Sequence, residues 1–297
     1  MYPAPFNYHR PETLQEAIGL MAKLGDDAQA IAGGQSLIPM MKLRVGTAPE
    51  IIDIGRLPNL DYIELRGSTL HIGALARHAD IAASDAARQI PMLLDCAGGI
   101  ADKQVRNMGT IGGSTAIADP SGDWPCCLRV LGADIVCTGA SGSRTVNIAD
   151  FITDSYTTVL TNDELVTEIR IKLPPANGSS AYVAFKRAAS AYPTATAGVL
   201  LIMNDGVCEQ ARIALGAAGS TAVVSAEAEA MLQGKQPDNE LLKQVAETIV
   251  AESSPAADAR GSEQFKRAML RSLVVDAAER ALARSRGEQV KGGHRYA

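Results

Sequence analysis

The sequence predicts an α+β protein with two N-terminal subdomains and a C-terminal domain in which strands precede helices. A chain of 297 residues exceeds the usual size of one domain. A cluster of structure breakers, Pro174-Pro175-Ala176-Asn177-Gly178, separates mixed helix and strand patterns from three strand patterns followed by three helix patterns. We therefore expect domains at 1–177 and 178–286, subdomains at about 1–56 and 57–177, and a tail at 287–297.

The first subdomain is expected to contain a helix, two strands and a glycine turn. Apolar residues recur at helical spacing between Pro11 and Gly25, at Leu14, Ala17, Ile18, Met21 and Leu24. The segments "AQAIA" (28–32) and "EIIDI" (50–54) predict short strands. Between them lies "AGGQSLIPMMKLR" (32–44), where we expect a glycine loop that ends at Pro39.

The second subdomain is expected to be built on hairpins. The segments "LDYIEL" and "TLHIGAL" flank Arg66-Gly67-Ser68, "ADIVCTG" pairs with "SRTVNI", and "ELVTEIRIKLP" is a strand. "ARHADIAAS" and "PMLLDCAGGI" predict helices. For "NMGTIGGSTAIADPSGDWP" (107–125) we expect a long shaped loop, because glycines disfavour a regular helix.

The C-terminal domain is expected to begin with the strands "SAYVAFKRA", "AGVLLIMNDG" and "VCEQARIALG". Asn204-Asp205-Gly206 predicts a tight hairpin turn. Apolar periodicity predicts helices at 226–233, 239–251 and 263–284, followed by a frayed polar tail.

The charge pattern disfavours two classes of protein. The net charge is −5 and no basic stripe occurs, so we expect no nucleic-acid partner. The sequence shows no signal peptide and no run of about 20 apolar residues, which favours a cytoplasmic protein without a membrane span.

The cysteines and histidines do not form a metal-site pattern. The five cysteines, Cys96, Cys126, Cys127, Cys137 and Cys208, include no C-x-x-C pair, so we expect buried reduced thiols and no iron–sulfur cluster or metal held by this chain. His9, His71, His78 and His294 are each expected to be surface or capping residues.

Both glycine-rich runs could bind a diphosphate, because glycine leaves backbone N–H groups open to a ligand. Neither run matches the P-loop pattern or the Rossmann fingerprint. Taken alone, these residues leave two alternatives open, a diphosphate cradle and a pair of structural turns.

The two runs together resemble a known family. "AGGQSLIPMMKLR", followed by "GTIGGSTAIADPSGDWP", is similar to the FAD-binding medium subunit of molybdenum hydroxylases, which include carbon monoxide dehydrogenase and the FAD domain of xanthine dehydrogenase. The resemblance continues through "DELVTEIRIKLP" and "AFKRAASAYPTATAGV". It implies a vanillyl-alcohol-oxidase (PCMH) type fold, with FAD between the two N-terminal subdomains, and a C-terminal flavoprotein domain.

The resemblance also implies which residues bind FAD. The first loop would be Ile31, Ala32, Gly33, Gly34, Gln35, Ser36 and Leu37, and the second Thr110, Ile111, Gly112, Gly113 and Ser114. Asp123 would bond a ligand hydroxyl or amide, Lys186 would offer a cation, and Leu165, Ile100 and Tyr192 would contact the cofactor. Valine at Gly33 or Gly112 is expected to fill the diphosphate space and leave the fold intact.

The family implies a function for the chain as a subunit. It would carry FAD, take electrons from two [2Fe–2S] clusters of a small subunit and pass them to an external acceptor, beside a large molybdenum–molybdopterin subunit, in a dimer of heterotrimers. No residue of this chain need act as a catalytic acid or base. Two alternatives are a self-contained flavin oxidoreductase of the same fold, which would need a substrate domain with a paired acid and base, and a non-catalytic scaffold subunit, which would be colourless.

Overall fold

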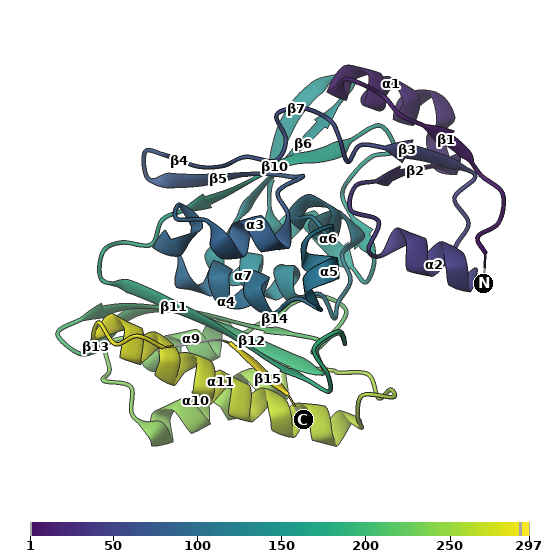
Figure 1. The fold of residues 1–297 in the computed structure, drawn as a ribbon. Helices are drawn as coiled ribbons and strands as arrows, with labels where there is room; N and C mark the ends of the chain where they lie inside the picture. The colour runs from purple at the N-terminus through teal and green to yellow at the C-terminus, as the bar shows by residue number, and fades with distance from the viewer. Residues whose placement is uncertain (1, 291–292, 297) are drawn as a thin grey trace.

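A computed structural model describes residues 2–290 and 293–296 of the chain. Two β-sheets and two groups of helices alternate in layers, and a smaller α/β unit from the N-terminus lies beside the upper layers (Figure 1). The first group of helices lies between the two sheets, so it contacts both the N-terminal and the C-terminal domain.

The first subdomain contains helix α1 (Leu14–Leu24) and a parallel sheet of order β1-β3-β2. The strands are β1 (Asn7–His9), β2 (Ala28–Ile31) and β3 (Glu50–Asp53), and a 3₁₀ turn, η1 (Gly25–Asp27), joins α1 to β2. The Thr13 hydroxyl accepts a hydrogen bond from the N–H of Glu16 and so caps α1. The helix and two strands predicted here are confirmed.

The prediction that Pro39 ends the first glycine loop is wrong. Helix α2 spans Leu37–Leu43, and Pro39 is its third residue. The first N–H groups of a helix have no intrahelical acceptor, so proline in the first turn removes no bond. The glycine loop therefore ends at Ser36, and a short helix follows it.

The second subdomain is an antiparallel sheet of order β4-β5-β10-β6-β7 with helices on one face (Figure 1). Its strands are β4 (Ile63–Arg66), β5 (Thr69–Gly73), β6 (Asp134–Gly139), β7 (Gly142–Asn147) and β10 (Leu165–Lys172), with a small hairpin of β8 (Ile152–Asp154) and β9 (Thr157–Thr158). Its helical elements are α3 (His78–Ala83), η2 (Ala87–Gln89), α4 (Pro91–Gly99), α5 (Lys103–Arg106), α6 (Ile111–Ile117), α7 (Asp123–Leu131) and α8 (Ile148–Phe151).

The expected long loop at 107–125 is also wrong, because α6 and the start of α7 lie within it. Thr110 caps α6 by accepting a hydrogen bond from the N–H of Gly113 at 3.2 Å. Ile111 is fully buried, and a Cβ at Gly112 would lie 2.5 Å from Cβ of Ala74. The cap and this close packing offset the helix penalty of about 1 kcal/mol for each glycine.

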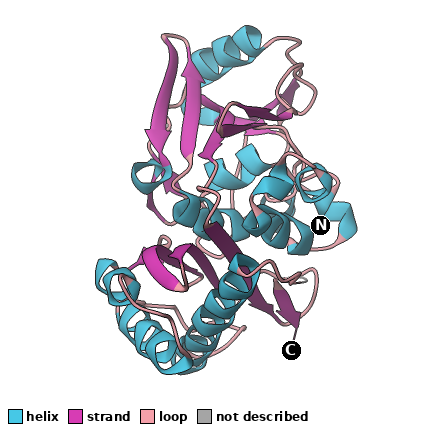
Figure 2. Ribbon diagram, turned by 90° about the vertical axis from the view of Figure 1, so that its left-hand side faces the viewer, coloured by secondary structure: helices cyan, strands magenta, loops and turns pink. Residues whose placement is uncertain are grey.

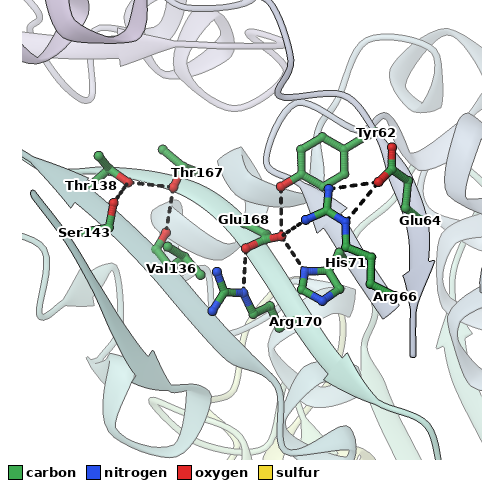
Figure 3. Close-up of polar contacts among 10 residues, drawn as sticks. All are labelled: Tyr62, Glu64, Arg66, His71, Val136, Thr138, Ser143, Thr167, Glu168 and Arg170. Atoms are coloured by element: carbon green, nitrogen blue, oxygen red, sulfur yellow. Dashed lines mark hydrogen bonds and ion pairs between the residues drawn. The ribbon is translucent and has the colours of Figure 1, made fainter. Parts of the chain in front are cut away.

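The opposite face of this sheet carries a polar cluster (Figure 3). The carboxylate of Glu168 is nearly buried, and it accepts hydrogen bonds from Tyr62 at 2.9 Å and Arg170 at 2.6 Å, with His71 Nδ1 at 2.6 Å. A β-bulge between Val166 and Glu168 places the carboxylate on this face. Its partners satisfy this carboxylate, so the cluster fastens β5 to β10.

The C-terminal domain is a sheet of order β14-β13-β12-β11-β15 covered by three helices (Figure 2). The strands are β11 (Gly178–Lys186), β12 (Ala195–Asn204), β13 (Val207–Gly216), β14 (Val223–Val224) and β15 (His294–Tyr296), and the helices are α9 (Ala226–Leu232), α10 (Asn239–Ala251) and α11 (Glu263–Ser285). The hairpin prediction is confirmed, since Asp205 (φ 49°) and Gly206 (φ 82°) form the turn.

The expectation of a frayed tail does not fit β15. This strand pairs in parallel with β11, and His294 lies opposite Ala184. Nε2 of His294 lies 2.9 Å from the carbonyl oxygen of Asp95, and its ring packs 5.9 Å from that of Tyr182. Gly99 leaves space for the imidazole, because a Cβ there would lie 1.7 Å from it. These contacts hold residues 294–296 against β11, and residues 291, 292 and 297 of the predicted tail lie outside the described residues.

The hydrophobic cores explain how the layers are joined. One core combines the helices α4 and α7 with the inner face of the C-terminal sheet, including Trp124, Tyr182 and Leu200. A second core lies between the outer face of that sheet and α9, α10 and α11. All five cysteines are buried and free, which confirms their prediction as packed thiols. None of the described helices combines the length and apolar character that crossing a bilayer requires.

A buried ion pair fastens the two domains to each other. Arg284 of α11 donates two hydrogen bonds to the carboxylate of Asp95 on α4, at 2.6 and 2.8 Å. Asp95 also accepts a bond from the N–H of Tyr182 at 3.2 Å. Both charged side chains are at most 11% exposed, so each depends on the other for its charge partner.

We predict that Arg284→Met lowers the stability of the whole chain by about 3–5 kcal/mol, because it leaves the Asp95 carboxylate buried without its cation. The matched control is Arg286→Met, which removes an exposed pair with Glu288 and should cost at most about 1 kcal/mol. The midpoints of urea denaturation measure both changes. Equal midpoints for the two variants would contradict the role of the buried pair.

Candidate functional site

A cavity of about 630 Å³ lies where the two N-terminal subdomains meet the C-terminal domain. Its volume is within the range of about 300–1,000 Å³ that is typical of small-molecule and cofactor sites. The first subdomain contributes the loop after β2, the second contributes α6 with the segment before β10, and the C-terminal domain contributes residues after β11. The site therefore forms only when all three parts are folded.

The first glycine loop lines the cavity and contains unused backbone donors. Residues Ile31 to Leu37 all line it and are half-buried. Within the described ranges, the N–H groups of Gly33, Gly34, Gln35 and Ser36 have no acceptor. The side chain of Gln35 donates to the carbonyl oxygen of Gly33 at 2.9 Å and so holds the loop in shape. Such a run of N–H groups is chemically suited to an anionic group such as a diphosphate.

One glycine of each loop packs closely against protein backbone. A Cβ on Gly33 would lie 2.0 Å from the carbonyl oxygen of Met108, and a Cβ on Gly112 would lie 2.7 Å from that of Ala74. The expectation that valine at either position would leave the fold intact is therefore wrong, because both side chains would meet protein backbone. These glycines are required for packing.

The second loop differs from the first in how its donors are used. Gly112 N–H bonds to the carbonyl oxygen of Ala74, Gly113 N–H to the Thr110 hydroxyl, and Ser114 N–H to the carbonyl oxygen of Thr110. Thr110, Gly112, Gly113 and Ser114 line the cavity, whereas Ile111 points into the core and does not. This loop therefore offers a ligand the surface of helix α6 and the Ser114 hydroxyl.

A buried charged group lies at the cavity wall, where the two domains meet. Nζ of Lys186 lies 3.2 Å from one carboxylate oxygen of Asp123, and the Tyr182 hydroxyl donates to the other at 2.9 Å. Lys186 also donates to the carbonyl oxygen of Gly99 at 2.9 Å. Both Asp123 and Lys186 line the cavity. The predicted cation is thus neutralised by the predicted carboxylate, and the two form one polar unit.

The remaining predicted residues form apolar and aromatic parts of the lining. Ile100 and Leu165 lie on the wall, and Tyr192 lies at the rim with 47% of the residue exposed. Every predicted site residue except Ile111 lines the cavity.

The structure adds His78, which we had expected to be a surface or capping residue. It is 5% exposed and lines the cavity, and its Nδ1 accepts a hydrogen bond from the indole N–H of Trp124 at 3.1 Å. Burial lowers the pKa of His78 to about 4. The imidazole is therefore neutral at neutral pH. Two features of the sequence could have pointed to this pair. His78 lies near the start of a predicted helix, and Trp124 is the single tryptophan of the chain.

Comparison with known families divides the chain into two matched parts. Residues 4–174 match the family described as "FAD binding domain in molybdopterin dehydrogenase". Residues 180–281 match the "CO dehydrogenase flavoprotein C-terminal domain".

Full-length relatives are similar to the whole chain. The carbon monoxide dehydrogenase medium chain of Afipia carboxidovorans is 38% identical over 96% of this chain and 100% of its own. The glyceraldehyde dehydrogenase medium chain of Sulfolobus acidocaldarius is 37% identical over 93% of this chain and 98% of its own. A carbon monoxide dehydrogenase structure from Hydrogenophaga pseudoflava superposes with a TM-score of 0.93 at 39% identity, over 96% of this chain and 99% of that chain. These likenesses confirm the predicted fold class.

The low pKa of His78 predicts a pH dependence of stability. The unfolded imidazole takes up a proton near its ordinary pKa of 6.5, whereas the native one does so only near 4. The free energy of unfolding should therefore fall as the pH decreases from 6.5 to 4, by up to about 3 kcal/mol from this group. His78→Gln, which does not titrate, should show a shallower fall in urea denaturation across this window. If the free energy of unfolding falls equally with pH in the wild type and in His78→Gln, the low pKa of His78 is contradicted.

Proposed function

The chain belongs to the FAD-binding medium subunits of the molybdenum hydroxylases, as its motifs predicted, and on this premise we propose that it is the electron-transfer subunit of such a complex. It is thus an oxidoreductase subunit. In the proposal it binds FAD in the cavity between its subdomains, receives electrons from the [2Fe–2S] clusters of a small subunit and delivers them to an external acceptor. A large molybdenum-cofactor subunit completes the complex, which we infer to be a dimer of heterotrimers. We include a cytoplasmic location in the proposal.

One observation carries the proposal, namely the run of unused N–H donors in the first glycine loop. These residues line the cavity and their N–H groups have no acceptor in the described part of the chain, so the groups are available to an anionic ligand. The donors of Gly33 to Ser36 would bind the diphosphate of FAD. Ser114 would bond to the same part of the cofactor from the opposite loop.

The other lining residues would orient the cofactor. Asp123 and Lys186 present both an acceptor and a donor beside the cavity, while their mutual ion pair limits the net charge that they bring. Ile100 and Leu165 would contact the apolar faces of the rings. Tyr192, at the exposed rim, would lie beside the isoalloxazine and limit the access of water.

When bound, FAD supplies the switch between one-electron and two-electron chemistry. Residues of this chain would bind the cofactor, orient it and exclude water from it. For binding the cofactor, no residue of the cavity wall needs to act as a catalytic acid or base. The Asp123 carboxylate is already bonded to Tyr182 and Lys186, which supports a binding role for it.

The cavity assignment predicts the effect of a side chain at Gly113. This exposed helical glycine lines the cavity, and a Cβ there would contact only the Thr110 hydroxyl, at 3.0 Å. Gly113→Leu should weaken FAD binding at least about tenfold, which is a loss of about 1.4 kcal/mol, because the side chain occupies ligand space. Titration of the apoprotein with FAD, followed by flavin fluorescence, measures the effect.

The matched control is Gly98→Leu, on helix α4. A Cβ at Gly98 meets no atom within 4 Å, and this residue does not line the cavity. Both variants gain the same helix propensity. Equal FAD affinity in the two variants would show that the ligand lies elsewhere.

The proposed electron route is tested by purifying the chain from its native cell together with its partners. We expect flavin absorption, iron–sulfur absorption and molybdenum in one complex, with the flavin bands bleached when a substrate of the large subunit is added. Flavin without partners would favour a self-contained oxidoreductase instead. A colourless chain would favour the scaffold alternative.

A further inference from the structure

His78 differs from the other polar side chains of the cavity. One ring nitrogen, Nδ1, is bonded to the indole N–H of Trp124 at 3.1 Å. The other, Nε2, has no hydrogen-bond partner in the parts of the chain that the structure describes. The side chain is 5% exposed and lines the cavity. Because His78 lines the cavity, a ligand bound there can pair with this nitrogen.

Trp124 determines which nitrogen of His78 carries the proton. The indole N–H can only donate, so Nδ1 must be the acceptor and therefore carries no proton. In a neutral imidazole the proton then lies on Nε2. Burial keeps the ring neutral, because it lowers the pKa to about 4. At neutral pH the ring therefore has one N–H donor, on the nitrogen that Trp124 leaves free.

The fold keeps this donor next to the second glycine loop. The backbone N–H of His78 donates to the carbonyl oxygen of Gly109 at 3.1 Å, and Arg77 and Thr110 form a β-bridge beside it. A Cβ on Gly109 would lie 2.8 Å from Nε2, so the glycine is needed where the imidazole packs. Nε2 thus lies at the base of the loop that leads into α6.

The surrounding protein groups are already engaged. The carbonyl oxygen of Val105 accepts from the N–H of Gly109 at 2.7 Å. The guanidinium of Arg106 donates to the carbonyl oxygens of Ile100 and Ala101, at 2.8 and 2.7 Å. Asp123 is bonded to Tyr182 and Lys186. The free donor of His78 is therefore available to a molecule in the cavity.

We propose that His78 is a further cofactor-binding residue, which donates a hydrogen bond from Nε2–H to an oxygen of the diphosphate or ribityl part of FAD. Trp124 is a positioning residue, since it selects the tautomer that can donate. The inference rests on the proposed FAD site and adds to it one donor, with the residue that positions it, outside both glycine loops.

Affinity measurements on the full-length apoprotein test the donor. His78→Phe should weaken FAD binding about tenfold, since one hydrogen bond to an oxygen acceptor is lost. His78→Gln can both accept from Trp124 and donate to the ligand, and should restore at least part of the affinity. Trp124→Phe keeps the imidazole but no longer fixes its proton on Nε2. It should weaken FAD binding by about two- to threefold. Phenylalanine and glutamine variants that both bind FAD like the wild type would overturn the proposal.

A measurement on the unmutated protein keeps the test decisive if a variant misfolds. In protein labelled with ¹⁵N-histidine, Nδ1 of His78 should show the shift of an unprotonated nitrogen with and without FAD. The Nε2 proton should exchange with solvent in the apoprotein and become protected when FAD is added. An unprotected Nε2 proton in the FAD-bound protein would overturn the inference and leave the FAD site intact. If the wild-type chain does not bind FAD at all, the proposed function fails together with it.

Discussion

The cavity depends on a backbone contact between two glycine-rich segments. Gly33 lies so close to Met108 that a Cβ would come within 2.0 Å of its carbonyl oxygen. Only a residue without a side chain allows the first subdomain to approach the second at this distance. The contact sets the first loop against the segment that leads into α6, and this loop, whose N–H groups have no protein acceptor in the described part of the chain, lines the cavity. Changing this spacing would separate the first loop from Ser114 and from the Asp123–Lys186 pair.

Local patterns predicted most of the secondary structure. Helix α11 and the β12–β13 hairpin follow from residues close together in the sequence, an apolar period in one case and Asn204-Asp205-Gly206 in the other. Apart from Pro39, which the first turn of α2 accommodates locally, the errors arose where distant contacts decide the conformation. Helix α6 is stabilised by burial of Ile111 and by the packing of Gly112 against Ala74. Strand β15 depends on Tyr182 and Asp95, which are far from the tail in the sequence.

The candidate site was likewise predicted in its local motifs but not in its distant contacts. The motifs pointed to residues that nearly all line one cavity, but their spacing could not show how they are bonded to one another. The pairing of Asp123 with Lys186 joins α7 to the last strand residue of β11, in another domain. The pairing of His78 with Trp124 likewise joins α3 to α7. Each of these contacts requires the packed helices between the two sheets, so no local pattern predicts it.

A crystal structure of the chain with FAD bound tests the proposed cofactor site most directly. We expect diphosphate oxygens within hydrogen-bond distance of the backbone N–H groups of Gly33 to Ser36, on the side that faces α6. A diphosphate bound away from this loop, with these N–H groups left unpaired, would show that the two glycine segments do not form the cofactor site.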